Sequence, residues 1–177
     1  MLFDYSREPH SDIAFVDMKS FYASCECVRL GLNPLTTSLC VMSRSDNSAG
    51  LILASSPVFK QVFGKKNVSR SYDLPFDLKT RKFNSYAAKK QGLPTDPAFI
   101  ASIESWAKRT LIVPPRMNAY IQVNMEIQKV FQEFAAPDDI FPYSIDEGFI
   151  DLTSSLNYFI PDPSLSRKEK LDLLSAR

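Results

Sequence analysis

The chain has 177 residues, of which 45% are hydrophobic and 23% are charged, and its formal net charge is +1. This length and composition suit one sizeable domain, or a domain with a small appended lobe, in a soluble globular protein. The apolar runs are too short to span a membrane and the first residues do not have the pattern of a signal peptide, so we expect a cytoplasmic protein without membrane contact.

The cysteines do not predict a disulfide framework or a metal site. Cys25, Cys27 and Cys40 are sparse and odd in number, and the first two form a C-x-C pair whose geometry is poor for a disulfide. Such a set fits a reducing compartment. Because His10 is the single histidine, we predict that the thiols are small core or surface groups.

The first half of the chain alternates short apolar runs with helical patterns. Ile13–Val16 is fully apolar, which is typical of a buried central strand, and it ends at Asp17. A helix is expected from an N-cap at Ser20 to a stop at Gly31. Further strands at 39–42 and 51–54 would form a hairpin around 45–47, and Ser56-Pro57 would open a helix that runs to about Gly64.

The second half is irregular from Lys65 to Thr110, with a break at 92–97. The remaining predicted elements are a helix through Ile103 and Trp106, a strand at 111–113, an amphipathic helix at 118–134, a strand hairpin from 140 to 152 and a helix capped by Ser166. This order suits an α+β domain in which helices back an antiparallel sheet, and the ferredoxin-like palm is one such arrangement.

Three carboxylates define a candidate site. Asp17 ends the first strand, and Asp146 and Glu147 lie at the tip of the last hairpin. If the two strands are neighbours, the carboxylates converge, and their mutual repulsion would require a cation. Oxygen ligands without nearby histidine or cysteine favour Mg²⁺ or Mn²⁺ over zinc. The residues alone therefore support metal-assisted phosphoryl transfer without selecting a substrate.

A basic stretch from Lys60 to Lys90 is interleaved with aromatic residues. It contains the cations Lys60, Lys65, Lys66, Arg70, Lys79, Arg81, Lys82, Lys89 and Lys90 and the aromatics Tyr72, Phe76, Phe83 and Tyr86, against Asp73 and Asp77. Such a pattern can contact phosphates or stack on single-stranded bases. Taken alone, it is more often a solvated face.

Two motifs carry a family resemblance. The segment Phe15-Val16-Asp17-Met18-Lys19-Ser20-Phe21-Tyr22-Ala23-Ser24-Cys25-Glu26 closely resembles the opening motif of Y-family DNA polymerases, in the wording of the UmuC (ImpB/MucB/SamB) branch. The segment Tyr143-Ser144-Ile145-Asp146-Glu147-Gly148-Phe149-Ile150-Asp151 is similar to the second metal-binding motif of that family. The resemblance covers most of Ile13 to Leu152, except for the middle.

The resemblance implies a catalytic centre with two Mg²⁺ ions, with Mn²⁺ as a substitute. Asp17 and Asp146 would bridge the ions, the Met18 carbonyl would complete one site, and Glu147 would lie beside the primer terminus. In the sugar pocket, Tyr22 matches the steric gate that clashes with a 2′-hydroxyl, and Phe21 would support it. A core aromatic on the first helix is the alternative for Tyr22.

The segment 54–64 resembles the fingers helix that binds the incoming triphosphate, with departures. The usual basic ligand falls on Gln61, so that Lys60 is only a candidate, and the usual tyrosine falls on Val58, or on Phe59 in a shifted register. Ser55 could keep the hydroxyl contact. Together, Phe21, Tyr22, Ser55 and Lys60 form the predicted nucleotide-binding set.

The resemblance predicts an incomplete ferredoxin-like palm at 1–30 and 111–177, and a small α/β fingers subdomain with an elaborated insertion at 31–110. Members of the family continue after the second motif with a thumb and a little finger, which we do not find in the sequence after Leu152. We therefore expect the chain to be a fragment of an error-prone translesion DNA polymerase of the SOS response, and we expect that this fragment alone does not extend primers. The expected partners are primer-template DNA, a deoxynucleoside triphosphate and, through a C-terminal part, a sliding clamp. The alternatives are a non-catalytic DNA- or repair-factor-binding fragment and another two-metal palm enzyme such as a nucleotidyl cyclase.

Overall fold

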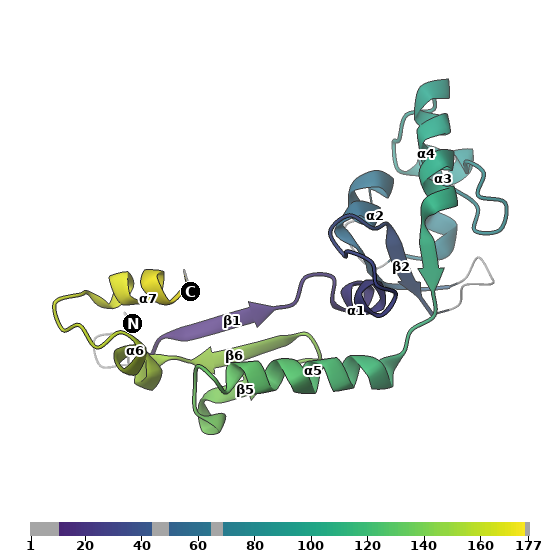
Figure 1. The fold of residues 1–177 in the computed structure, drawn as a ribbon. Coiled ribbons are helices and arrows are strands. Elements are labelled where there is room, and N and C mark those ends of the chain that lie inside the picture. Colours follow the sequence, from purple (N-terminus) through teal and green to yellow (C-terminus); the bar gives the residue numbers. More distant parts are fainter. Residues whose placement is uncertain (1–10, 44–49, 65–68, 176–177) are drawn as a thin grey trace, which may run out of the picture. The chain divides into compact units, whose positions relative to one another are not determined.

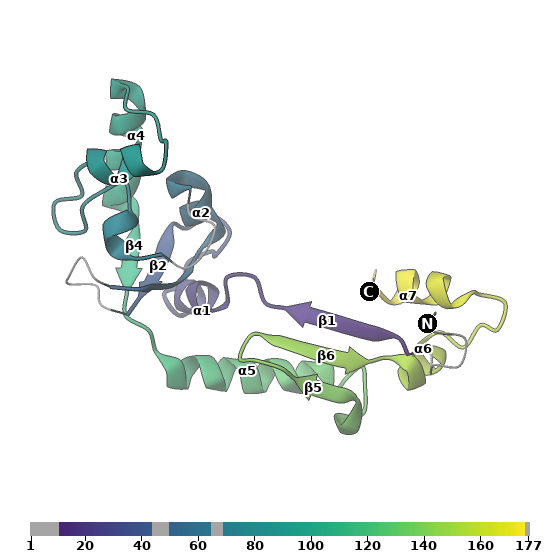
Figure 2. The same cartoon turned by 180° about the vertical axis from the view of Figure 1, so that it is seen from behind.

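Two compact units make up the chain, and the computed structural model describes its residues 11–43, 50–64 and 69–175. Unit 1 takes in the chain up to Met18 and from Ile121 onward, and unit 2 is Lys19–Tyr120. Each unit contains its own three-stranded sheet (Figures 1 and 2). The mixed α and β content agrees with the predicted fold class, whereas the assignment of palm and fingers boundaries stays a prediction.

Unit 1 is built on an antiparallel sheet of order β1-β6-β5. Its strands are β1 (Ile13–Asp17), β5 (Ile140–Pro142) and β6 (Glu147–Asp151). Helix α5 (Met117–Phe131) runs along this sheet (Figure 1), and Phe131 and Ile150 pack together with Ala14 and Val16 in its core. Burying one face of the sheet under an amphipathic helix is the physical reason for this arrangement.

The other face of this sheet corrects the prediction for the first strand. Ile13 and Phe15 are 53% and 54% exposed, and β1 is an edge strand among the described residues. The prediction of a fully buried central strand is therefore wrong. An apolar run such as 13–16 does not reveal whether one or both faces are covered, and here α5 covers only the face of Ala14 and Val16.

The remaining elements of unit 1 follow the sheet. They are a 3₁₀ turn at Pro137–Asp139, α6 (Thr153–Phe159) and α7 (Arg167–Ser175). Ser166 caps α7 as predicted: its hydroxyl accepts from the Glu169 amide at 3.3 Å, and the Glu169 carboxylate accepts from the Ser166 amide at 2.8 Å. This reciprocal pair is a capping box.

Unit 2 is built on a sheet of order β3-β2-β4, in which β2 and β3 are antiparallel and β2 and β4 are parallel. Its elements are α1 (Phe21–Arg29), β2 (Leu39–Met42), β3 (Ile52–Ser55), α2 (Pro57–Phe63), a 3₁₀ turn at Ser71–Asp73, α3 (Ser85–Lys90), α4 (Pro97–Arg109) and β4 (Leu111–Val113). The predicted hairpin of β2 and β3 is confirmed, although its turn at 45–47 lies outside the described residues. Every residue of β2 is buried, because helices cover both of its faces.

The helix boundaries predicted for unit 2 are confirmed at Ser20, Gly31, Ser56 and Gly64. The Ser56 hydroxyl accepts from the Phe59 amide at 3.3 Å, and Gly64 and Gly31 adopt the left-handed conformation with φ of 67° and 69°. Ser20 precedes α1 but is itself left-handed, with φ of 54°, and its side chain does not cap the helix. The helix therefore begins after Ser20 as predicted, although the Ser20 side chain makes no capping hydrogen bond.

The cysteines are free thiols, as predicted. Cys27 and Cys40 are fully buried in unit 2, and Cys25 is half-buried. Burial raises the pKa of Cys40 to about 12, and burial together with the neighbouring Glu26 raises that of Cys25 to about 11. Among the described residues, no helix is long and apolar enough to cross a membrane.

Candidate active site

The structure brings Asp17 and Glu147 together in unit 1. They are paired residues of the antiparallel strands β1 and β6, so their side chains lie on the same face of the sheet. Asp146 adjoins this pair, because the Met18 amide donates to the Asp146 carbonyl at 2.9 Å. The two strands that carry the motifs are therefore neighbours, which was the condition set by the sequence.

Hydrogen bonds fix the turn that carries Asp146. The Ser144 amide donates to the Glu147 carbonyl at 3.0 Å, and the Ser144 hydroxyl donates to the Asp146 carboxylate at 3.1 Å. From α5, the Asn124 side chain donates to the Ile145 carbonyl at 2.8 Å. Sequence reasoning missed Asn124, because a polar residue on an amphipathic helix carries no signal of a partner 21 positions away.

Carboxylates of this site do not form a closed cluster. Within 11–43, 50–64 and 69–175, no three His, Cys, Asp or Glu side chains gather closely enough to hold a metal ion. Three like charges repel one another in the absence of a counter-charge. The donor set still fits a hard divalent cation, since Asp17, Asp146, Glu147 and the Met18 carbonyl offer only oxygen atoms from adjacent positions of paired strands.

The predicted nucleotide-binding residues all lie in unit 2. Tyr22 is half-buried on α1 and packs on the cluster of Ala23, Cys27, Leu39 and Val41, and Phe21 is 4% exposed. Lys60 is exposed on α2, and its ammonium group donates to the Ser20 hydroxyl at 3.2 Å. Ser55 ends β3 and is 5% exposed.

Side-chain exposure on α2 narrows the choice among the residues predicted to contact the triphosphate. Phe59 is fully buried in the core of unit 2, so the shifted register that would place a phosphate-contacting ring there has no geometric support. Val58 is half-buried, whereas Lys60 and Gln61 are exposed. Of these positions, only Lys60 offers a cation.

A buried carboxylate in unit 2 was not predicted as a functional group. Glu26 is 1% exposed and accepts hydrogen bonds from the Tyr120 hydroxyl at 2.9 Å, from Arg116 at 3.0 Å and from Arg29 at 3.1 Å. A buried charge is tolerated when it is paired in this way. Arg116 and Tyr120 are 90 and 94 positions from Glu26, so local patterns could not reveal the contact.

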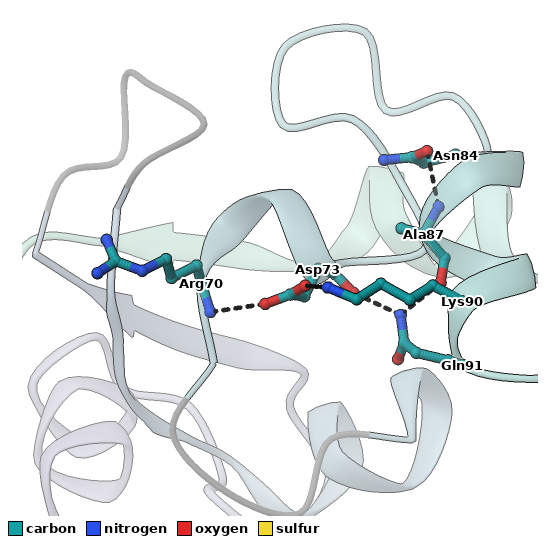
Figure 3. A network of polar contacts seen from close by, with 6 residues as sticks. All are labelled: Arg70, Asp73, Asn84, Ala87, Lys90 and Gln91. Carbon is teal, nitrogen blue, oxygen red and sulfur yellow. Dashed lines mark hydrogen bonds and ion pairs between the residues drawn. The ribbon is translucent and has the colours of Figure 1, made fainter.

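Two residues of the basic stretch, Arg70 and Lys90, belong to a polar network around Asp73 (Figure 3). The Asp73 carboxylate accepts from the Arg70 amide at 3.3 Å and from the Lys90 ammonium at 3.2 Å, while the Gln91 side chain donates to the Asp73 carbonyl at 2.6 Å. The network ties the 3₁₀ turn to α3, near the exposed rings of Tyr72 and Tyr86. Lys65 and Lys66, also part of the predicted basic stretch, lie outside the described residues.

Comparison with solved structures shows which fold the chain has. The chain resembles a Y-family DNA polymerase chimera in fold, with a TM-score of 0.50 and 20% sequence identity over 93% of this chain and 37% of that chain. Those regions are the palm and fingers of that class of polymerase. The fold is thus that of a part of a Y-family polymerase.

Sequence comparison names the family. Residues 83–171, half of the chain, match the model of the impB/mucB/samB family. The chain is 36% identical over 143 residues to the DNA repair protein homolog YozK of Bacillus subtilis, covering 81% of this chain and 98% of YozK. The chain therefore belongs to the impB/mucB/samB family.

Two longer relatives come from the same organism. The chain is 37% identical to the putative UV-damage repair protein UvrX, over 85% of this chain and 29% of UvrX. It is 31% identical to a DNA polymerase IV, over 83% of this chain and 28% of that relative. The chain thus spans less than a third of the length of these two proteins and nearly the whole of YozK.

Proposed function

We propose that the chain supplies the metal-binding and sugar-selecting parts of a translesion DNA polymerase, which transfers a nucleotide from a deoxynucleoside triphosphate to a primer 3′-hydroxyl. The observation that carries the proposal is the pairing of Asp17 with Glu147, with Asp146 tied to the end of β1, in a member of the impB/mucB/samB family. Like charges in paired positions weaken a sheet, so a cation-binding function explains this arrangement better than a structural one.

Asp17, Asp146, Glu147 and the Met18 carbonyl would hold the metal. When bound, a pair of Mg²⁺ ions neutralises charge on the triphosphate and activates the attacking hydroxyl. The protein contributes position: the Met18 amide and the Asn124 side chain hold the backbone of the turn, and the Ser144 hydroxyl orients the Asp146 carboxylate. A fixed ligand set lowers the cost of ordering the site when substrate binds.

Residues of unit 2 would hold the incoming nucleotide. The half-buried ring of Tyr22 would lie under the deoxyribose and exclude a 2′-hydroxyl, with Phe21 beneath it. Lys60 is the candidate phosphate ligand because its ammonium group is exposed and already points to the Ser20 hydroxyl at the start of α1. Ser55 would add a hydroxyl contact.

The setting of this activity is a further part of the proposal. The relatives bear names of DNA repair proteins and of a DNA polymerase, which supports primer-template DNA as the partner. Error-prone repair synthesis in the SOS response is the role that we propose. A sliding clamp would bind through a further part of the polymerase, and the reaction would take place in the cytoplasm.

The experiment that tests the proposal has a metal arm and an activity arm. Titration with Mn²⁺, followed by NMR, should broaden the amide signals of Met18 and Glu147 in the wild-type chain and leave them sharp in Asp146→Ala. An exposed-site control, Asp138→Ala, should broaden like wild type. In a polymerase that contains this chain, Asp146→Ala should abolish primer extension, and full extension by that variant would refute the proposed role.

A further inference from the structure

Among the described residues of unit 2, Glu26 carries the most deeply buried charged side chain, and it is not one of the proposed nucleotide contacts. It lies on α1, one turn beyond Tyr22, and is 1% exposed. Its two oxygen atoms accept three hydrogen bonds, one from a phenol and two from guanidinium groups. The Arg116 and Arg29 side chains are 41% and 42% exposed, so they face solvent as well, whereas the phenol that binds Glu26 is fully enclosed.

That phenol belongs to Tyr120, which lies in the first turn of α5 and is 0% exposed. The Tyr120 amide donates to the Arg116 carbonyl at 3.2 Å, so the two residues are one helical turn apart and both reach Glu26. Burial, together with the hydrogen bond to Glu26, raises the pKa of Tyr120 to about 12. The hydroxyl is therefore a protonated donor at neutral pH, and its hydrogen bond fixes the plane and the depth of the ring.

The ring of Tyr120 in turn contacts the aromatic pair of α1. It stacks on Tyr22, with ring centroids 4.5 Å apart and an interplanar angle of 12°, and meets Phe21 edge-on at 6.4 Å. Of the three rings, Phe21 and Tyr120 are buried, and Tyr22 alone retains substantial exposure. The half-buried ring of Tyr22 is thus held by the buried ring of Tyr120 stacked against it.

We infer that Tyr120, anchored by the buried carboxylate of Glu26, is a positioning residue that holds the ring of Tyr22 and thereby sets discrimination between deoxyribose and ribose. This inference rests on the proposed role of Tyr22 as steric gate. A steric gate discriminates by a clash with the unwanted group, so a ring that could tilt away would admit a 2′-hydroxyl. The stack opposes tilting of Tyr22, and the hydrogen bond to Glu26 prevents Tyr120 from moving with it.

The aromatic ring of Tyr120, the hydroxyl of Tyr120 and the charge of Glu26 can each be removed by a different variant. Tyr120→Leu removes the stack, Tyr120→Phe keeps the ring but removes the hydroxyl, and Glu26→Gln keeps a hydrogen-bond acceptor but removes the charge. A residue that serves only packing would tolerate Tyr120→Phe without any change at Tyr22. An exposed tyrosine of the same unit, Tyr86 at 80% exposure, provides the matched control as Tyr86→Leu.

The first measurement uses the chain itself and needs no nucleotide. Ring resonances of Tyr22, followed by NMR, should shift strongly in Tyr120→Leu and measurably in Tyr120→Phe and Glu26→Gln, with faster ring rotation in each. They should not move in Tyr86→Leu. Unchanged Tyr22 resonances in Tyr120→Leu, in a variant whose remaining spectrum shows it to be folded, would overturn the inference whatever the function of the protein.

The second measurement compares binding of dATP and ATP in the presence of Mn²⁺. We expect Tyr120→Leu to lose about three- to tenfold of the preference for dATP, the range given by the loss of one aromatic stack, with little change in affinity for dATP. An unaltered preference in that variant would overturn the inference. Should the wild-type chain bind neither nucleotide, the proposed function fails for this chain, and the Tyr22 resonances alone decide whether Tyr120 and Glu26 position that ring.

Discussion

Replacing Asp17 by asparagine should change the stability of unit 1 in opposite directions without and with metal. Asp17 and Glu147 are directly paired on β1 and β6, where Cβ atoms of opposed residues lie about 4.5–5.5 Å apart. Two unit charges about 5 Å apart in water-like surroundings repel by about 0.8 kcal/mol. Without metal, Asp17→Asn should therefore raise the free energy of unfolding of unit 1 by roughly 0.5–1 kcal/mol.

Metal binding should reverse this difference in stability between wild type and Asp17→Asn, because only the wild-type chain keeps all the proposed ligands. At a hundredfold excess over its dissociation constant, a bound cation stabilises the folded state by about 2.7 kcal/mol. The asparagine variant binds Mn²⁺ more weakly and gains less. In Mn²⁺, Asp17→Asn should therefore be less stable than wild type.

Hydrogen exchange of the β6 amides is the suitable assay, because it reports the opening of unit 1 separately from unit 2. The control is Asp138→Asn, an exposed site on the 3₁₀ turn of the same unit, which should stay within about 0.5 kcal/mol of wild type under both conditions. Equal stabilisation of wild type and Asp17→Asn by Mn²⁺ would refute the ligand assignment. A loss of metal-free stability in Asp17→Asn would refute the repulsion.

Three further outcomes concern unit 2. Tyr120→Phe should lower the free energy of unfolding of unit 2 by about 1.5–3 kcal/mol, because the buried Glu26 carboxylate loses a hydrogen-bond donor. Tyr86→Phe should change that free energy little. Fluorescence of the single tryptophan, which lies in unit 2, measures the unfolding of both variants. Glu26→Gln should lower the pKa of Tyr120 from about 12, which phenol absorbance measures. Because folding raises this pKa from 10, the contribution of the Tyr120 hydroxyl to the free energy of unfolding is full below pH 10 and is lost as the pH rises toward 12. Asp73→Asn should lower the raised pKa of Lys90, measured by NMR, because it removes the hydrogen-bonded carboxylate.

Local signals were sufficient for most elements of the fold. Ser56-Pro57 and Gly64 delimit α2 because a hydroxyl cap, a proline in the first turn and a left-handed glycine each act over a few residues. The left-handed Ser20 shows the limit of such signals: a serine before a helix predicts a cap, yet here the backbone turns away and the hydroxyl accepts from Lys60 instead.

Contacts between distant segments were beyond the sequence patterns. The parallel pairing of β2 and β4, the exposure of Phe15 and the partners of Glu26 depend on which elements pack together, and residues 39 and 111, or 26 and 120, carry no mutual signal. The candidate site could be predicted because β1 ends at Asp17 and β6 begins at Glu147, whereas the contact of Asn124 with the turn could not be predicted.

The paired carboxylates supply the last step of the argument. At neighbouring positions of β1 and β6, the chain places apolar partners opposite one another, as with Phe15 and Phe149, whose ring centroids are 4.9 Å apart. Two residues further on, the same ladder places Asp17 opposite Glu147. A sequence that satisfies local pairing rules along a ladder and breaks them at one end sacrifices stability there, and such conflicts are expected where a site must bind something. The position of the conflict supports the metal-binding proposal independently of any resemblance.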